Sequence, residues 1–242
     1  MTFKKRIGQI HLWLGLASGI IVIIVSLTGC IYVFEKEIRN LTEPYQFVEV
    51  RQKPYLPPSR LKQIAEKHLE GNIANNVMYR SPGLSATVGF FDKQHYYLIY
   101  LNQYTGEVLK VKNMNRDFFR FILDGHYYLW LPPVVGHPTV ATGTLLFVIL
   151  LITGLVLWWP KNLNKANTEK SFKIKWGASF KRVNYDLHNV LGFYVTIIAL
   201  IIALTGLVWG FEWFAKSAYW VTSGGKTMPT FKPALSDTTQ TA

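Results

Sequence analysis

The stretch Ile10–Phe34, with the sequence IHLWLGLASGIIVIIVSLTGCIYVF, decides the fold of this chain. It has 25 residues and contains no Asp, Glu, Lys or Arg. A helix rises about 1.5 Å per residue, so this stretch is long enough to cross a hydrocarbon core of about 30 Å. Two later stretches, Pro133–Trp159 and Leu187–Phe211, have 27 and 25 residues and also lack these charged residues. The sequence therefore predicts a membrane protein with a bundle of three transmembrane helices.

The three spans divide the 242 residues into segments of unequal length. We predict an N-terminus and first span over 1–34, an outer domain over 35–132, a second span over 133–159, a loop over 160–186, a third span over 187–211 and a polar tail over 212–242. Among the segments outside the spans, only 35–132 is long enough to form a folded domain. With 50% hydrophobic and 17% charged residues, the chain does not belong to the disordered, collagen-like or coiled-coil classes.

The net charge of the chain is +12, and many of its basic residues lie beside the spans rather than in a nucleic-acid-binding motif. Three basic residues precede the first span and seven more lie in the loop over 160–186, namely Lys4, Lys5, Arg6, Lys161, Lys165, Lys170, Lys173, Lys175, Lys181 and Arg182. Basic residues that flank spans stay on the cytoplasmic side. We therefore expect a cytoplasmic N-terminus, with the outer domain and the C-terminal tail outside, in a periplasm if the cell is Gram-negative, and no nucleic-acid partner.

Cys30 is the only cysteine, which excludes an intrachain disulfide and a c-type haem attachment. Lys4–Arg6 followed by an apolar run that ends in Leu27-Thr28-Gly29-Cys30 is also the pattern of a lipoprotein signal peptide. The apolar core of a signal peptide has about 7 to 15 residues, whereas this run continues to Phe34. The pattern favours a retained span.

The first and third spans share a repeat that contains a histidine. The pattern is His-x-x-Leu-Gly with a Thr-Gly pair whose threonine follows the histidine by 17 residues: His11, Leu14, Gly15, Thr28 and Gly29 in the first span, and His188, Leu191, Gly192, Thr205 and Gly206 in the third. Both spans are expected to enter the membrane from the cytoplasmic side. His11 and His188 are therefore expected at the same depth.

A histidine within an apolar span is costly to place there, which favours a functional interpretation. Small residues follow each histidine on the same helical face, Gly15 and Gly19 after His11 and Gly192 and Thr196 after His188. Two neutral imidazoles from neighbouring helices, with room for a flat group, are what a six-coordinate b-type haem requires. Zinc is less favoured, because structural zinc takes four ligands and often thiolates. The alternative is that the small residues only allow close helix packing and that headgroups solvate the histidines.

Two more histidines lie on the expected outer side. His126 comes shortly before the second span and His137 at its start. Pro132-Pro133 lies between them, so their spacing is not that of one helical face. Each is a candidate ligand for a second haem, and the alternative is an ordinary residue of the membrane interface. His68 and His95, in the outer domain, are weaker candidates.

The outer domain has the pattern of one helix followed by antiparallel strands. We predict a helix over Arg60–Leu69, strands over Val77–Arg80, Ala86–Phe91, Tyr96–Leu101 and Val108–Val111, and a hairpin turn over Asn102–Glu107. Such a small α+β domain is near the lower size limit for independent folding, so it is expected to lean on the membrane helices or on a partner. The sequence contains no nucleophile–base pair, paired catalytic carboxylates or phosphate-binding loop that would assign catalytic residues.

In these features the chain resembles the PepSY-associated transmembrane family, whose members include inner-membrane ferric-siderophore reductases. The residues that carry the resemblance, in chain order, are His11-Leu12-Trp13-Leu14-Gly15-Leu16, Thr28-Gly29, Phe34-Glu35-Lys36-Glu37-Ile38, the helix and the Tyr104-Thr105-Gly106-Glu107 hairpin of the outer domain, His126, Thr153-Gly154, Trp158-Trp159-Pro160, and Tyr185-Asp186-Leu187-His188-Asn189-Val190-Leu191-Gly192.

The resemblance implies haem b held between the spans by histidines, and electrons passed from the inner side to a periplasmic ferric siderophore or other ferric chelate. It implies His11 and His188 as the inner iron ligands and His126 as an outer one. Family members usually have a fourth span with another histidine. We therefore expect a shortened protein or a fragment, or a partner for His126 in His137 or in another subunit of a homo-oligomer.

Two hypotheses of other classes compete with electron transfer. In the first, the PepSY-like domain is a binding or regulatory module and the spans are only anchors. In the second, the chain is an accessory subunit of an iron–siderophore transporter. The first predicts that replacing His11 and His188 by Ala leaves the behaviour of the protein intact, whereas changes on the surface of the outer domain do not. The second predicts co-purification with a permease in the absence of any pigment.

Overall fold

The computed structural model describes residues 2–69, 71–92, 95–160, 162 and 164–230. The chain forms two compact units, one of residues Met1–Val22 with Pro133–Ala242 and the other of residues Ile23–Pro132. Residues 231–242 of the predicted polar tail, and Lys161 of the basic loop, lie outside the described residues.

The first unit contains the helices that are long and apolar enough to cross a membrane. These are α1 (Phe3–Tyr32), of which the residues up to Val22 belong here, α5 (Pro133–Trp158) and α7 (Phe180–Gly210). The three predicted transmembrane helices are therefore confirmed among the described residues. Helices α1 and α7 begin seven residues before their apolar stretches, at Phe3 and Phe180. The preceding segments are rich in Lys and Arg, which are good helix formers, so the helix continues beyond the apolar stretch.

Small residues bring the long helices of the first unit close together. A side chain at Gly143 of α5 would meet the Cγ2 atom of Ile21 on α1 at 2.6 Å, and one at Gly210 of α7 would meet the Cβ atom of Ala141 at 2.9 Å. A buried cluster fills the contact between α5 and α7, with Val148, Ala203 and Leu207 at its centre. Small residues at helix contacts are the usual basis of packing between helices in lipid.

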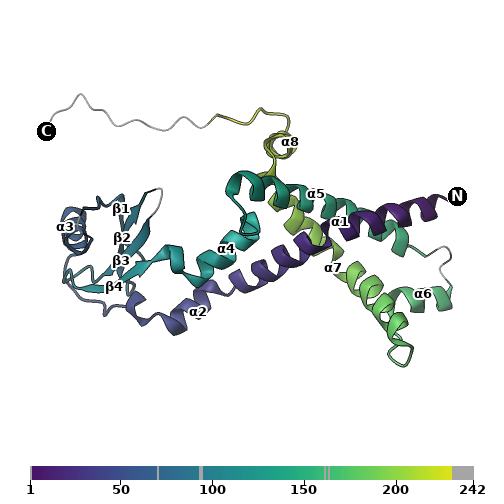
Figure 1. Ribbon diagram of the computed structural model, residues 1–242, viewed down its shortest axis with the longest axis horizontal. Coiled ribbons are helices and arrows are strands. Elements are labelled where there is room, and N and C mark those ends of the chain that lie inside the picture. Colours follow the sequence, from purple (N-terminus) through teal and green to yellow (C-terminus); the bar gives the residue numbers. More distant parts are fainter. Residues whose placement is uncertain (1, 70, 93–94, 161, 163, 231–242) are drawn as a thin grey trace. The chain divides into compact units, whose positions relative to one another are not determined.

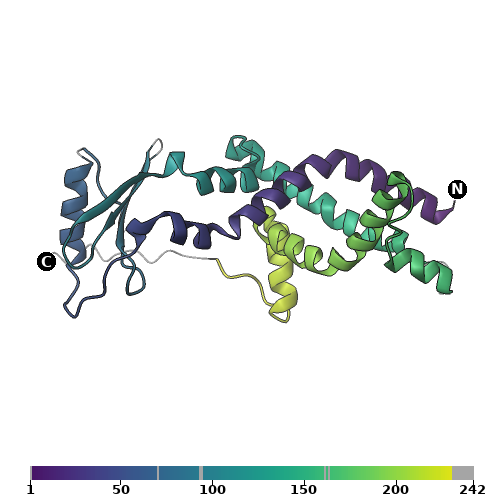
Figure 2. The ribbon, with the colours of Figure 1, turned by 90° about the horizontal axis from the view of Figure 1, so that it is seen from below.

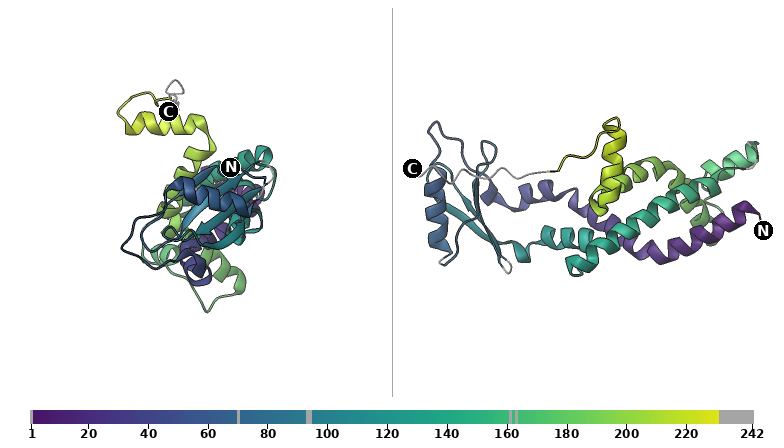
Figure 3. Two further views of the ribbon diagram at one scale, coloured as in Figure 1. Left: turned by 90° about the vertical axis from the view of Figure 1, so that its left-hand side faces the viewer. Right: turned by 90° about the horizontal axis from the view of Figure 1, so that it is seen from above.

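Two short helices complete the first unit (Figure 1). Helix α6 (Lys165–Phe172) precedes α7, and Phe172 of α6 packs edge-on against Trp158 of α5. Helix α8 (Glu212–Thr222) follows α7 after a single residue, Phe211, and runs crosswise to it (Figure 3). Its Trp213 and Trp220 are more than half exposed, as tryptophans at a membrane interface are. The sequence pattern did not predict α6 or α8.

The second unit contains the predicted α+β domain (Figure 2). Strands β1 (Asn76–Met78), β2 (Ala86–Phe91), β3 (Tyr96–Leu101) and β4 (Val108–Asn113) form an antiparallel sheet in the order 1-2-3-4. Helix α3 (Pro58–His68) covers one face and contributes Leu61 and Ala65 to a core shared with Val88, Ile99 and Leu101. The predicted first strand ended at Arg80, whereas β1 ends at Met78, shortly before a turn that the Leu84 amide closes by donating to the Ser81 carbonyl at 3.0 Å.

Two further helices of the second unit connect this domain to the membrane helix. Helix α2 (Glu35–Thr42) follows α1 directly and leads into the short helix η1 (Pro44–Gln46). Helix α4 (Phe118–Tyr128), which carries His126, follows β4 through the short helix η2 (Met114–Arg116). Asp117 caps α4 by accepting a hydrogen bond from the Arg120 amide at 3.0 Å. These helices were not predicted, although Asp117 is a typical N-cap residue.

A buried ion cluster holds α2, β4 and the start of α4 together. Arg39 on α2 pairs with Glu35 at 2.7 Å and Glu43 at 2.8 Å, and it also contacts Asp117. Lys112 on β4 pairs with Asp117 at 2.7 Å. Burial alone would raise the pKa of the Asp117 carboxyl, but the hydrogen bonds from Arg39 and Lys112 lower it to about 2. The cluster therefore fixes the N-terminal end of α4, the helix that carries His126.

The chain breaks between α4 and α5, as Pro132-Pro133 predicted. Helix α4 ends at Tyr128 and α5 begins at Pro133. Leu129 and Trp130 adopt left-handed φ angles of 54° and 57°, which end the helix. His126 and His137 therefore lie on different helices, and they belong to different units.

Candidate functional site

The centre of the candidate site is a pair of histidines in the first unit. His11 on α1 and His188 on α7 come from spans that are 176 residues apart in the chain. Their imidazole ring centres are 6.2 Å apart and the ring planes are inclined by 70°. His11 is half-buried and His188 is exposed. The fold therefore brings together the two histidines that the sequence repeat singled out.

The His11 ring is held by α5. Its Nδ1 atom lies 2.9 Å from the Thr153 hydroxyl oxygen. The neighbouring Gly154 allows this contact, because a Cβ atom there would be 3.3 Å from the Cε1 atom of His11. The hydroxyl of Thr153 also donates to the Ile149 carbonyl at 2.8 Å, one turn earlier on α5.

The two glycines predicted beside these histidines have different surroundings. A Cβ atom at Gly15 would be in ordinary contact with Leu150 at 3.8 Å, so this glycine lies at the α1–α5 packing contact. A Cβ atom at Gly192, one turn after His188, would meet no described atom within 4 Å. Thr196, a further turn along α7, is half-buried and bonds the Gly192 carbonyl. Open space beside a histidine is thus found at Gly192 and not at Gly15.

His126 has a similar environment within the second unit. Its Nδ1 atom lies 3.0 Å from the Val25 carbonyl oxygen and 3.3 Å from the Thr28 hydroxyl oxygen, both on α1. A Cβ atom at Gly29 would be 3.1 Å from the Cε1 atom of His126. His126 is half-buried and packs edge-on against Tyr127. The Thr28-Gly29 pair of the repeat is therefore a histidine contact.

The remaining histidines lie apart from the His11–His188 pair and from His126. His137 lies exposed in the first turns of α5, just before Pro138. His68 is the last residue of α3, and His95 contacts Asp92 at 3.2 Å in an exposed turn of the outer domain. The pairing of His126 with His137 remains a prediction.

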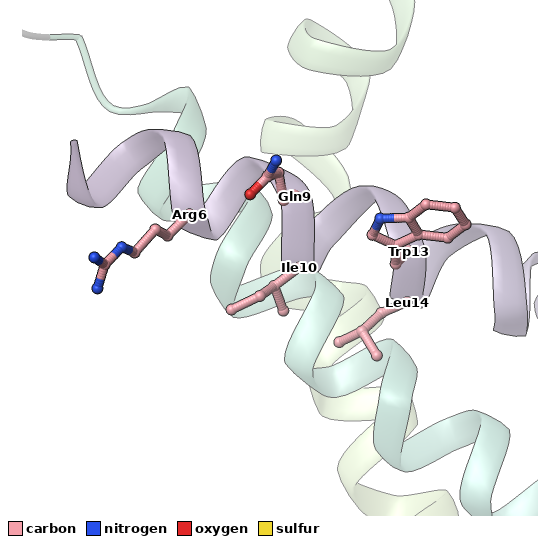
Figure 4. A pocket seen from close by; sticks show the side chains of 5 residues that line it. All are labelled: Arg6, Gln9, Ile10, Trp13 and Leu14. Atoms are coloured by element: carbon pink, nitrogen blue, oxygen red, sulfur yellow. The ribbon is translucent and has the colours of Figure 1, made fainter. Parts of the chain in front are cut away.

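A shallow hollow of about 480 Å³ on the surface of α1 does not coincide with the histidine pair (Figure 4). It is lined by Arg6, Gln9, Ile10, Trp13 and Leu14. The lining combines a basic residue with an exposed tryptophan near the start of a span, which is the composition of a membrane interface.

The chemistry of the histidine pair fits an ion held between two imidazoles. The ring centres of His11 and His188 lie 6.2 Å apart, a separation of the size that an ion bonded to one nitrogen of each ring at about 2.0 Å would need. These two side chains would hold such an ion. Among the residues that the structure describes, no three His, Cys, Asp or Glu side chains form a metal-binding group. A haem needs only two protein ligands, because the porphyrin supplies the other four.

The sequence singles out the histidines but not the residues that hold them. Thr28 belongs to the Thr-Gly pair of the repeat, and Thr153 to a Thr-Gly pair that is part of the family resemblance. The available signal was that every span contains a Thr-Gly pair: Thr28-Gly29 in the first, Thr142-Gly143 and Thr153-Gly154 in the second, and Thr205-Gly206 in the third. Which helix faces each pair depends on the three-dimensional packing.

The comparisons with known proteins agree with the fold. The family model described as the PepSY-associated TM region matches residues 9–242, nearly the whole chain. No curated protein matches the chain.

Proposed function

Since this chain belongs to the PepSY-associated TM family, we propose that it is a haem b-containing electron-transfer protein of the bacterial inner membrane. Its proposed role is to reduce ferric siderophores on the periplasmic side, so that iron is released. Each ferric ion takes up one electron and becomes ferrous, a state that siderophores bind more weakly. The donor is an unidentified reductant on the cytoplasmic side.

The observation that carries this proposal is the 6.2 Å separation of the His11 and His188 rings. In the proposal, these two side chains would hold the haem iron, and haem would supply the one-electron couple. The open space at Gly192 leaves room for a flat group beside His188. The apolar residues of the spans keep water away, which tunes the reduction potential through burial.

His126 is the proposed ligand of a second, outer haem. Its support is the contact with α1, which resembles the contact of His11 with α5. We propose that the second ligand of that iron is His137 or comes from another subunit. The proposed orientation, with the N-terminus in the cytoplasm, follows from the basic residues beside α1 and α7.

The first experiment is an optical spectrum of the detergent-purified full chain, oxidised and then reduced with dithionite. We expect a sharp low-spin b-type band in the reduced wild type. The double variant His11→Ala/His188→Ala should lose the inner haem and the corresponding part of this band. His95→Ala is the matched control and should leave the spectrum unchanged, because His95 lies in an exposed turn of the outer domain.

A colourless wild type, after haem supplementation during expression, would contradict the proposal and favour a PepSY binding module. If the band is present, addition of a ferric siderophore to the reduced protein tests the substrate. Reoxidation of the band at the rate of ferrous ion release supports siderophore reduction, and a band that stays reduced contradicts it.

A further inference from the structure

The two half-buried histidines are held by the same arrangement of neighbouring residues. In each case a Thr-Gly pair on one helix faces a histidine on another: Thr153-Gly154 faces His11, and Thr28-Gly29 faces His126. The glycine lets the Cε1 edge of the ring approach the helix backbone. The threonine hydroxyl oxygen then lies beside the Nδ1 atom of the ring.

The direction of the His11 hydrogen bond follows from the bonding of Thr153. The Thr153 hydroxyl donates to the Ile149 carbonyl at 2.8 Å, with the Leu150 carbonyl at 3.2 Å as a second acceptor. A hydroxyl has one hydrogen, so its oxygen accepts from His11. The Nδ1 atom of His11 therefore carries the hydrogen, and in the neutral ring the Nε2 atom has the free lone pair.

The same result holds for His126 on stronger grounds. Its Nδ1 atom lies 3.0 Å from the Val25 carbonyl oxygen, which only accepts hydrogen bonds. The Thr28 hydroxyl donates to the Ile24 carbonyl at 2.7 Å, so its oxygen is also an acceptor for Nδ1. Nδ1 is thus the donating nitrogen of both histidines, which in the neutral ring is the Nδ1–H tautomer.

We propose that Thr153-Gly154 locks His11 in the Nδ1–H tautomer, that Thr28-Gly29 together with the Val25 carbonyl does the same for His126, and that both rings present Nε2 as the metal-binding nitrogen. This inference rests on the proposed function only for the identity of the ion, haem iron. A hydrogen bond from the ring N–H of a ligating histidine fixes its orientation and raises its basicity. Thr153 is accordingly a positioning residue of the inner site, and at the outer site Thr28 shares that role with the Val25 carbonyl.

The test uses the full chain, isotopically labelled on histidine nitrogen, purified without haem and measured by NMR in detergent micelles. The ring nitrogens are assigned with His11→Ala and His126→Ala. We expect Nδ1 to be protonated and Nε2 unprotonated for both residues. A protonated Nε2 at His11 in the wild type would overturn the inference, whether or not the protein binds haem.

Three variants separate a positioning role from a packing role. Thr153→Val removes the only acceptor for His11 that the described residues provide, and it should weaken haem retention by about 10- to 100-fold. It should also shift the reduction potential to more positive values, because a less basic imidazole stabilises ferric iron less. Thr153→Ser keeps the hydroxyl and should restore both. Thr205→Val is the matched control, since a Cβ atom at Gly206 meets Thr144 and no described histidine.

The outer site makes a contrasting prediction. In Thr28→Val the Val25 carbonyl remains as an acceptor, so His126 should keep its Nδ1–H tautomer.

Equal haem retention and potential in wild type and Thr153→Val would overturn the positioning role of Thr153. A wild type with the expected tautomers that binds no haem would leave the tautomer assignment in place and contradict the proposed function instead.

Discussion

At the scale of single residues, the site depends on which side chains are missing as much as on which are present. Gly154 and Gly29 each leave space that an imidazole edge fills. Gly192 leaves space that no described atom fills. Gly154 and Gly29 follow a threonine and face a histidine, whereas Gly192 follows a leucine and faces open space.

The open space at Gly192 predicts a selective effect of Gly192→Ala. The variant should fold as well as the wild type, because its Cβ atom meets nothing within 4 Å and alanine is the better helix former. Haem content should fall, because the added methyl group occupies the space beside His188. Thermal unfolding of the haem-free protein and haem content per chain measure the two effects. Gly143→Ala is the contrasting variant and should destabilise the haem-free protein by about 1–3 kcal/mol through overpacking against Ile21.

Unchanged haem content in Gly192→Ala would contradict the assignment of this space to a flat ligand. Loss of stability in the haem-free Gly192→Ala protein would contradict the description of the space as open.

At the scale of elements, the buried ion cluster is the contact that fixes α4. Arg39, Lys112 and Asp117 come from three different elements, and their side chains are 12%, 11% and 5% exposed. Removing one partner of a buried ion pair leaves the other charges uncompensated, which costs far more than loss of a surface pair. The cluster is therefore the point at which the outer domain is most sensitive to a single substitution.

Asp117→Asn should destabilise the attachment of α2 and α4 by about 3 kcal/mol. The asparagine can still cap α4, so the loss reports on the ion pairs. Hydrogen exchange of the α2 and α4 amides in the full chain measures it. Asp124→Asn is the matched control, because the Asp124–Arg120 pair is exposed and should contribute less than about 1 kcal/mol. Equal exchange in the two variants would show that the cluster does not hold these helices.

The same ion cluster predicts that the stability of the folded state falls at low pH. The pKa of Asp117 is lowered from its ordinary value of 3.8 to about 2 in the folded chain, against the opposing effect of burial. A carboxyl with a lowered folded pKa stabilises the folded state fully above its unfolded pKa. This contribution should be constant above about pH 5 and disappear as the pH falls from about 4 to about 2. In Asp117→Asn, the part of the acid destabilisation due to this carboxyl should be absent, as hydrogen exchange at a series of pH values can show.

At the scale of the whole molecule, the chain is a multi-pass membrane protein of the PepSY-associated TM family. Its orientation is a prediction from the placement of Lys and Arg. Single cysteines on a Cys30→Ser background test it with a membrane-impermeant maleimide. Thr105→Cys, in an exposed turn of the outer domain, should react in intact cells, and Lys173→Cys, between α6 and α7, should react only after the inner membrane is opened. Labelling with the reverse pattern would contradict the orientation and place His11 and His188 near the periplasmic face.

The sequence by itself determined the number of spans, the outer domain and the two spans that bear the repeat. Charge-free runs of 25 to 27 residues have few alternatives to crossing a membrane, and alternating apolar residues specify strands. The strands over Ala86–Phe91 and Tyr96–Leu101 were predicted to the residue. The short helices α2, α4, α6 and α8 were missed, since their polar or aromatic segments carry no long apolar period.

Only the tertiary structure decided what each histidine contacts. The repeat predicts that His11 and His188 share a depth, but their 6.2 Å approach depends on how α1 and α7 pack. The Thr153–His11 and Thr28–His126 contacts join residues 142 and 98 positions apart. The Thr-Gly dipeptide occurs in all three spans, but Gly206 faces Thr144 and Gly143 faces Ile21 instead of a histidine. A local pattern sets the composition of a helical face, whereas the partner of that face is set by the packing of helices that are distant in the chain.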